Sequence, residues 1–128
     1  MGSYWRVMGR YNAETQAYSA FAGAGLASPF TPAKDGRLIG IRIIVGSEAA
    51  TSLTEGVLIK LTCTKWTPNV MEFAVQGNGI RTAPAAKTPV YDFVCDQPVS
   101  ESSPITLEGQ CVEATHVTNS VYVLGQFV

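Results

Sequence analysis

Hydrophobic and polar side chains alternate along several short segments of the chain, most clearly in residues 37–46. The odd-numbered positions of this segment are all β-branched (Ile39, Ile41, Ile43 and Val45), whereas the even-numbered positions are mixed (Leu38, Gly40, Arg42 and Ile44). Successive side chains of a strand point to opposite faces, and β-branched residues suit a pleated, half-buried surface. The segment therefore predicts a strand with one fully apolar face, which a second layer must cover, and one mixed face.

Six further segments show strand-like alternation: residues 3–11, 57–66, 70–76, 90–96, 105–112 and 121–128. Residues 113–117 could add an eighth strand. Turn-forming residues separate the segments, among them Thr67-Pro68-Asn69 and Gly77-Asn78-Gly79. No segment has the period of a long amphipathic helix. Short strands at regular spacing predict an all-β fold, an antiparallel β-sandwich or barrel.

Residues 12–31 differ in character from these segments. Ala, Gly and Ser dominate, charges are few, and three aromatic residues are present, namely Tyr18, Phe21 and Phe30. This composition is unlike a solvated linker and predicts an extended arm that lies against its own sandwich or a neighbour. The chain thus divides into an N-terminal strand and arm, residues 1–34, and a β-sandwich domain, residues 35–128. We expect deletion of residues 1–31 to abolish assembly and to leave the sandwich folded.

The composition favours burial of part of the surface by other subunits. The chain has 128 residues, enough for one domain, of which 46% are hydrophobic and only 15% charged, against a usual charged share of about 25%. A monomer with a large core is the alternative. The net charge is −1 and the nine basic residues are scattered, so we expect contact with neither nucleic acid nor a membrane surface. We also find neither an apolar run long enough to span a membrane nor a signal peptide.

Catalytic motifs are absent from the sequence. His116 is the only histidine, and a hydrolase triad would need it beside a nucleophile and a carboxylate, for which Ser120, Cys111 and Asp96 are candidates. No Gly-x-Ser-x-Gly motif accompanies them. His116 is therefore interpreted as a structural or surface residue.

The spacing of the acidic residues and the cysteines does not fit a catalytic carboxylate pair or a metal site. Asp92 and Asp96 are four residues apart on one strand, about 13 Å, which exceeds the separations used by glycosidases. Glu108 and Glu113 are predicted on opposite faces. The cysteines are three and dispersed (Cys63, Cys95 and Cys111), and they are interpreted as buried free thiols. We predict no enzyme activity, no metal and no cofactor.

The aromatic residues are compatible with two hypotheses about function, sugar binding and self-association. Trp5 and Trp66, with Tyr4 and Tyr11, could form a platform that stacks on sugars, although core packing is the more common role of such side chains. Self-association is the other reading, because an extended segment can add a strand to an exposed sheet edge. The first strand could equally pair within its own sheet. The predicted self-association residues are Tyr4, Trp5, Val7, Tyr11, Tyr18, Phe21 and Phe30.

An N-terminal arm, about eight strands with long loops, and an apolar final strand (residues 121–128) together resemble a single jelly-roll capsid protein or decoration protein of a virus particle. The resemblance is architectural and covers most of the chain. It implies a jelly-roll-like sandwich, a homo-oligomer that could also contact other particle subunits, and a location in the virion. Many capsid arms are basic, whereas residues 3–31 contain only two basic residues, Arg6 and Arg10. The alternatives are a lectin-like or carbohydrate-binding module and a filament subunit that donates strands.

Overall fold

The computed structural model describes residues 2–12, 18–21, 28–45, 56–76, 90–111 and 120–128. This part of the chain forms β-strands and contains no helix. The strands are β1 (Tyr4–Asn12), β2 (Ser19–Ala20), β3 (Gly36–Val45), β4 (Gly56–Thr62), β5 (Val70–Gln76), β6 (Val90–Val99), β7 (Thr106–Cys111) and β8 (Ser120–Phe127). The prediction of an all-β protein is confirmed.

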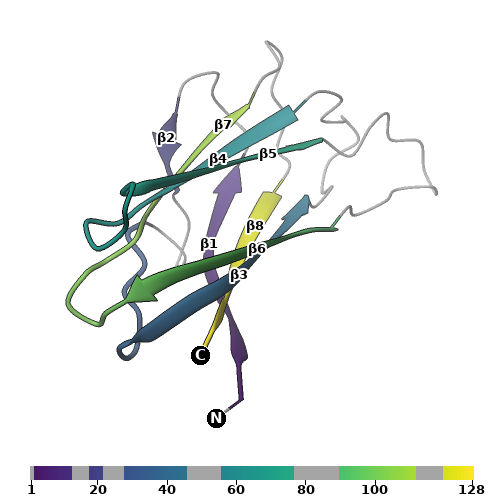
Figure 1. The fold of residues 1–128 in the computed structure, drawn as a ribbon. Helices are drawn as coiled ribbons and strands as arrows, with labels where there is room; N and C mark the ends of the chain where they lie inside the picture. The colour runs from purple at the N-terminus through teal and green to yellow at the C-terminus, as the bar shows by residue number, and fades with distance from the viewer. Residues whose placement is uncertain (1, 13–17, 22–27, 46–55, 77–89, 112–119) are drawn as a thin grey trace.

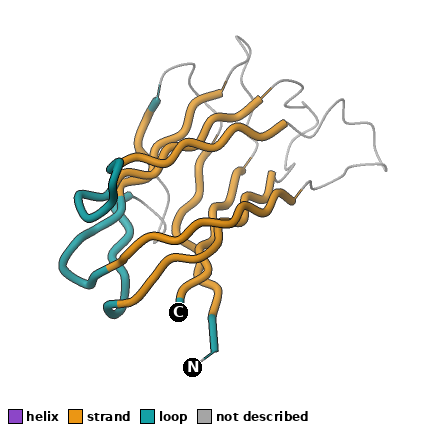
Figure 2. The backbone as a smooth tube through the Cα atoms, in the orientation of Figure 1, coloured by secondary structure: helices purple, strands orange, loops and turns teal. Residues whose placement is uncertain are grey.

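The strands form two antiparallel sheets that face each other (Figure 1). The first sheet has the order β1-β8-β3-β6, and the second has the order β2-β7-β4-β5. The described connections 31–35, 63–69 and 100–105 gather at one end of the two layers (Figure 2). The predicted eighth strand at 113–117, the Gly77-Asn78-Gly79 turn and His116 lie outside the described residues.

Inward-facing side chains of both sheets make one hydrophobic core. Strand β3 lies between β8 and β6 and contributes Leu38, Ile41, Ile43 and Val45, all with no exposed surface. Opposite them, β4 and β7 contribute Val57, Ile59, Leu61 and Leu107, which are equally buried. The predicted alternation in these strands is therefore observed, because each has one face on the core and one on the outside.

Two register shifts change which side chains face inward. Strand β3 has a shift between Leu38 and Gly40, and as a result Leu38 is fully buried while Ile39 is half-buried. Strand β1 has a shift between Val7 and Gly9. Their even spacing predicts that Trp5, Val7 and Tyr11 share a face, but the shift places Tyr11 on the opposite face from Trp5 and Val7. An extra residue in one strand of a pair reverses the alternation beyond it.

The first strand pairs within its own chain. Strand β1 is antiparallel to β8 over its whole length, from Tyr4 opposite Phe127 to Asn12 opposite Ser120. Met8 and Tyr11 are 2% exposed and belong to the core. The sequence left open whether this segment pairs with another subunit or within its own sheet. In the structure it pairs within its own sheet.

The segment after β1 also contacts the sandwich where it is described. Strand β2 pairs with β7, and the Phe21 ring stacks on the Tyr11 ring with centroids 5.6 Å apart. Phe30 exchanges two backbone hydrogen bonds of 2.8 Å with Ile105. Residues assigned to the arm thus contribute strands to both sheets and rings to the core.

Candidate interaction surface

The outward-facing side chains of the first sheet form three rows across its four strands. The first row is Trp5, Gln126, Gly40 and Val94; the second is Val7, Leu124, Arg42 and Asp92; the third is Arg10, Tyr122, Ile44 and Val90. Together these positions form the outer face of the first sheet. Apart from the half-buried Ile39 at the register shift, their neighbours along β3 and β8 are buried.

Apolar side chains dominate this outer face, and four of them are strongly exposed: 96% for Val94, 53% for Val90, 41% for Val7 and 39% for Trp5. Three more are half-buried between them, namely Ile44, Tyr122 and Leu124. An antiparallel sheet whose face meets water usually has polar side chains there. A contiguous exposed apolar patch indicates an interaction site.

Arg42 connects the two edges of this face. Its guanidinium donates two hydrogen bonds to Asp92, with Nε to Oδ1 at 2.7 Å and Nη2 to Oδ2 at 3.0 Å. The same guanidinium lies 4.6 Å from the centroid of the Trp5 ring. The hydrogen bonds from Arg42 lower the pKa of Asp92 and raise that of Arg42. The exposed pair contributes little to stability, but it holds the Trp5 ring, the guanidinium and the carboxylate in a fixed order across the sheet.

The outer face of the second sheet has the opposite character. Its middle row is Ala20, Glu108, Lys60 and Glu72, and the flanking positions are Gln110, Leu58, Ala74, Thr106, Thr62 and Val70. Lys60 lies between two carboxylates, with its Nζ 3.7 Å from Glu108 Oε1. This face has the polar side chains of a solvated sheet, so the apolar patch is specific to the first sheet.

Tyr18 covers part of the polar row. Its hydroxyl donates a hydrogen bond of 3.4 Å to Glu72 Oε2, and Lys60 Nζ lies 4.2 Å from its ring centroid. Burial raises the pKa of Tyr18, and the negative charge of Glu72 adds to the effect. The side chain is thus held by the second sheet of its own chain.

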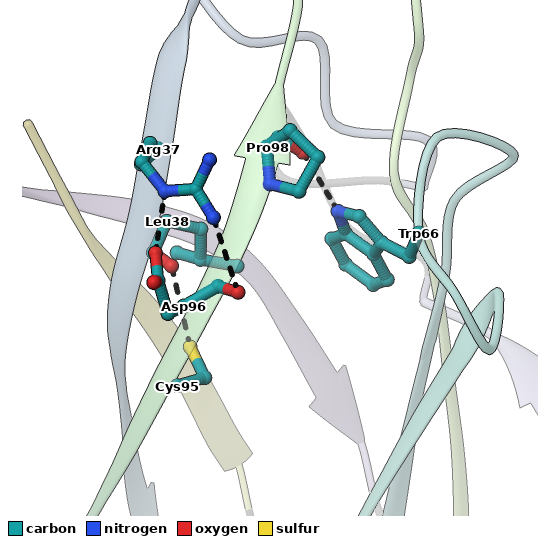
Figure 3. Close-up of polar contacts among 6 residues, drawn as sticks. All are labelled: Arg37, Leu38, Trp66, Cys95, Asp96 and Pro98. Atoms are coloured by element: carbon teal, nitrogen blue, oxygen red, sulfur yellow. Dashed lines mark hydrogen bonds and ion pairs between the residues drawn. The ribbon is translucent and has the colours of Figure 1, made fainter.

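Trp66 belongs to the core and not to a sugar-stacking platform. It is 3% exposed, and its Nε1 donates a hydrogen bond of 2.9 Å to the Pro98 carbonyl oxygen (Figure 3). Trp5 is on the outside of the first sheet, with Arg42 over its ring. The two tryptophans therefore share no surface.

The candidate carboxylates pair with separate bases. Asp92 is held by Arg42, and Asp96 is held by Arg37 at the end of the sheet (Figure 3). Glu108 lies on the other sheet, and Glu113 lies outside the described residues. Asp92, Asp96 and Glu108 thus each form an ion pair with a base on a neighbouring strand.

The two cysteines whose side chains are described are free thiols, Cys63 buried and Cys95 half-buried. The Cys95 thiol points to the Leu38 carbonyl oxygen, at 3.6 Å (Figure 3). Burial raises the pKa of this thiol to about 11, and the charge of Asp96 acts in the same direction. Such a thiol is a weak nucleophile near neutral pH.

The predicted self-association residues fall into two groups. Tyr11, Phe21 and Phe30 are buried in the core of their own chain, Tyr4 packs against that core, and Tyr18 contacts the second sheet. Only Trp5 and Val7 lie on the outer face of the first sheet. Self-association through this set stays a prediction, and its accessible part is this pair.

Sequence reasoning missed the rest of the face, which comes from β3, β6 and β8. A signal was present, since positions of both parities are apolar in residues 37–46 and 121–128, with Ile44, Tyr122 and Leu124 as the outward members. Val90 and Val94 gave a similar signal, since they alternate with Asp92 and Asp96 on the same face of β6. Apolar side chains on both faces of a strand indicate that both faces are covered.

Within the described residues, no helix is long and apolar enough to cross a membrane. Over the same residues, no three His, Cys, Asp or Glu side chains come together as metal ligands would. Comparison of the chain with models of known protein families, with curated proteins and with solved structures finds no match. Function is therefore argued from the surface itself.

Proposed function

We propose that this protein is a structural subunit of a symmetric assembly of identical chains, such as a viral capsid or a protein that decorates one. The observation that carries the proposal is the contrast between the two outer faces. Val94 is 96% exposed on the first sheet, whereas the second sheet presents an alternating row of Glu108, Lys60 and Glu72. Covering the first face with protein removes apolar surface from water while the second stays solvated.

The strand pairing supports a jelly roll as the architecture of this subunit. The antiparallel pairs β1·β8, β2·β7, β3·β6 and β4·β5 nest inside one another, as they do when one long antiparallel ribbon is wrapped into two sheets. Each sheet thus combines strands from both halves of the chain. Jelly rolls of eight strands occur in viral capsids, and they also occur in lectins, so the fold alone does not decide the function.

Electron microscopy and light scattering of the concentrated protein test the proposal. We expect closed particles of uniform size that contain many copies of the 13.7 kDa chain. Open filaments would favour a strand-donating subunit, and a monomer at every concentration would refute assembly.

A matched pair of lysine substitutions connects assembly to the face. Val94→Lys and Ala74→Lys both change exposed positions on edge strands, β6 of the first sheet and β5 of the second. Because a lysine on the covered face would be desolvated, we expect Val94→Lys to raise the concentration needed for assembly by at least about tenfold. Ala74→Lys should leave it unchanged. Equal effects of the two substitutions would contradict a role for this face.

A further inference from the structure

We propose that two copies of the chain pack the outer faces of their first sheets together around a two-fold axis that runs along the strands, between β8 and β3. This inference rests on the proposed self-assembly and specifies its elementary contact. The pattern of charge and shape on the face carries it.

Aligned packing of two sheets keeps their strands within about 30° of each other. Two orientations of a two-fold axis between the faces satisfy this condition. An axis across the strands places each strand over its own copy and exchanges the first and third rows. An axis along the strands places β1 over the partner's β6 and β8 over the partner's β3.

Charge distinguishes the two orientations. With the axis across the strands, the middle row faces itself, so Arg42 meets Arg42 of the partner subunit and Asp92 meets Asp92 of the partner subunit. Like charges that face each other destabilise an interface. With the axis along the strands, Arg42 faces Leu124 of the partner subunit and Asp92 faces Val7 of the partner subunit. No like charges then oppose each other, and the Arg42–Asp92 pair with its bonds of 2.7 and 3.0 Å stays intact.

Shape favours the same orientation. The axis along the strands brings Trp5 over the partner's Val94, two exposed apolar side chains on opposite edges of the face. It brings Tyr122 over the partner's Ile44, both half-buried and apolar. Trp5, Arg42 and Tyr122 are residue types that carry much of the binding energy at interfaces.

The face is small for a stable dimer. Between outermost Cα atoms it measures about 14 Å across the strands and about 13 Å along them, from the usual strand spacing and rise. A standard interface buries about 800 Å² on each partner. We therefore expect an isolated pair to form weakly and reversibly, and to become stable only within a larger assembly.

Cysteine crosslinking of mixed variants tests the orientation. Trp5→Cys and Val94→Cys are prepared as separate proteins, mixed at high concentration and treated with a bismaleimide, which joins two thiols through a short spacer. We expect a covalent heterodimer at least about tenfold above the wild-type background, because sheets packed face to face lie about 10 Å apart, which the spacer can bridge and a direct disulfide cannot. A mixture of Val90→Cys with Val94→Cys is the matched control, since only the axis across the strands brings these positions together.

The outcomes separate this inference from the proposed function. Crosslinking in the control mixture alone would overturn the orientation, and crosslinking in neither mixture, with both variants folded by circular dichroism, would overturn the pairing. If wild-type particles form while neither mixture crosslinks, the structural role stands and the pairing falls. If the first mixture crosslinks but the wild type never exceeds a dimer, the pairing stands and the role in a larger assembly falls.

Discussion

Gly109 of β7 lies directly against the Tyr11 ring of the opposite sheet. A Cβ atom at this position would lie 2.6 Å from Cγ of the Tyr11 ring, which comes from the opposite sheet. The ring therefore packs directly on the backbone of β7, and any larger residue must push the sheets apart or displace the ring.

We expect Gly109→Ala to lower the free energy of unfolding by about 1–3 kcal/mol, because overpacking a dense core costs that much. Denaturant unfolding followed by circular dichroism measures the change. Gly2→Ala is the control, since a Cβ there would meet nothing within 4 Å. A stability for Gly109→Ala equal to that of the control would show that the ring does not occupy this place.

The half-buried thiol of Cys95 gives a prediction about pH. Its pKa of about 11 exceeds the ordinary value of 9.0, so the thiolate fraction at pH 8 should be about a hundredfold lower in the folded chain than in the unfolded one. Alkylation at Cys95, followed by peptide mass spectrometry, should be slower by a similar factor in the native protein than in denaturant. It should accelerate as the pH rises toward 11.

The same shift affects stability in alkaline solution. The unfolded thiol ionises first as the pH passes 9, so the folded state should lose stability between pH 9 and 11. Cys95→Ser should weaken this dependence. Equal alkylation rates in native and denatured protein would contradict the burial of the thiol.

At the scale of elements, the first strand belongs to the sandwich. Strand β1 provides an edge of the first sheet and two core side chains, Met8 and Tyr11. Its removal would uncover the β8 edge and part of the core. We therefore predict, against the expectation from the sequence, that removal of residues 1–31 unfolds the sandwich.

We expect deletion of residues 1–12 to abolish cooperative thermal unfolding. Deletion of residues 1–3 is the control, because it spares β1 and removes only the hydrogen bond of 2.9 Å from Gln126 Nε2 to Ser3 Oγ. Circular dichroism during heating distinguishes the two. A sharp melting transition in the longer truncation would mean that the first strand is a separable arm.

The sequence predicts which segments form strands. It does not always predict which face of the sheet a side chain occupies. The alternation of residues 57–61 and 121–127 identifies both strands and their buried faces, because the extra residues of the register shifts lie in β1 and β3 and not in these strands. The shifts at Val7/Gly9 and Leu38/Gly40 depend on partner strands distant in the sequence, so local alternation assigns Trp5 and Ile39 to the wrong faces. Strand β2 was missed because a pair of residues, Ser19 and Ala20, carries no periodic signal.

At the scale of the whole molecule, the two outer faces differ, since the first sheet has an apolar outer face and the second a polar one. The composition indicated covered surface, since charged residues are only 15% of the chain, but it could not say where that surface lies. The location depends on strand order, which brings Trp5, Ile44 and Val94 from three separate segments to one face. A candidate surface made by such pairing has no linear motif.

The chain has two tryptophans, and they report on this surface separately. Trp66 is 3% exposed, whereas Trp5 is 39% exposed on the outer face of the first sheet. Acrylamide quenching of tryptophan emission, measured from micromolar to millimolar protein with light scattering on the same samples, tests whether copies of the chain cover that face. We predict a quenchable component from Trp5 in dilute protein that disappears as the mass rises above 13.7 kDa. Quenching of Trp5 that stays constant while the protein assembles, or a mass that never rises, would contradict the account.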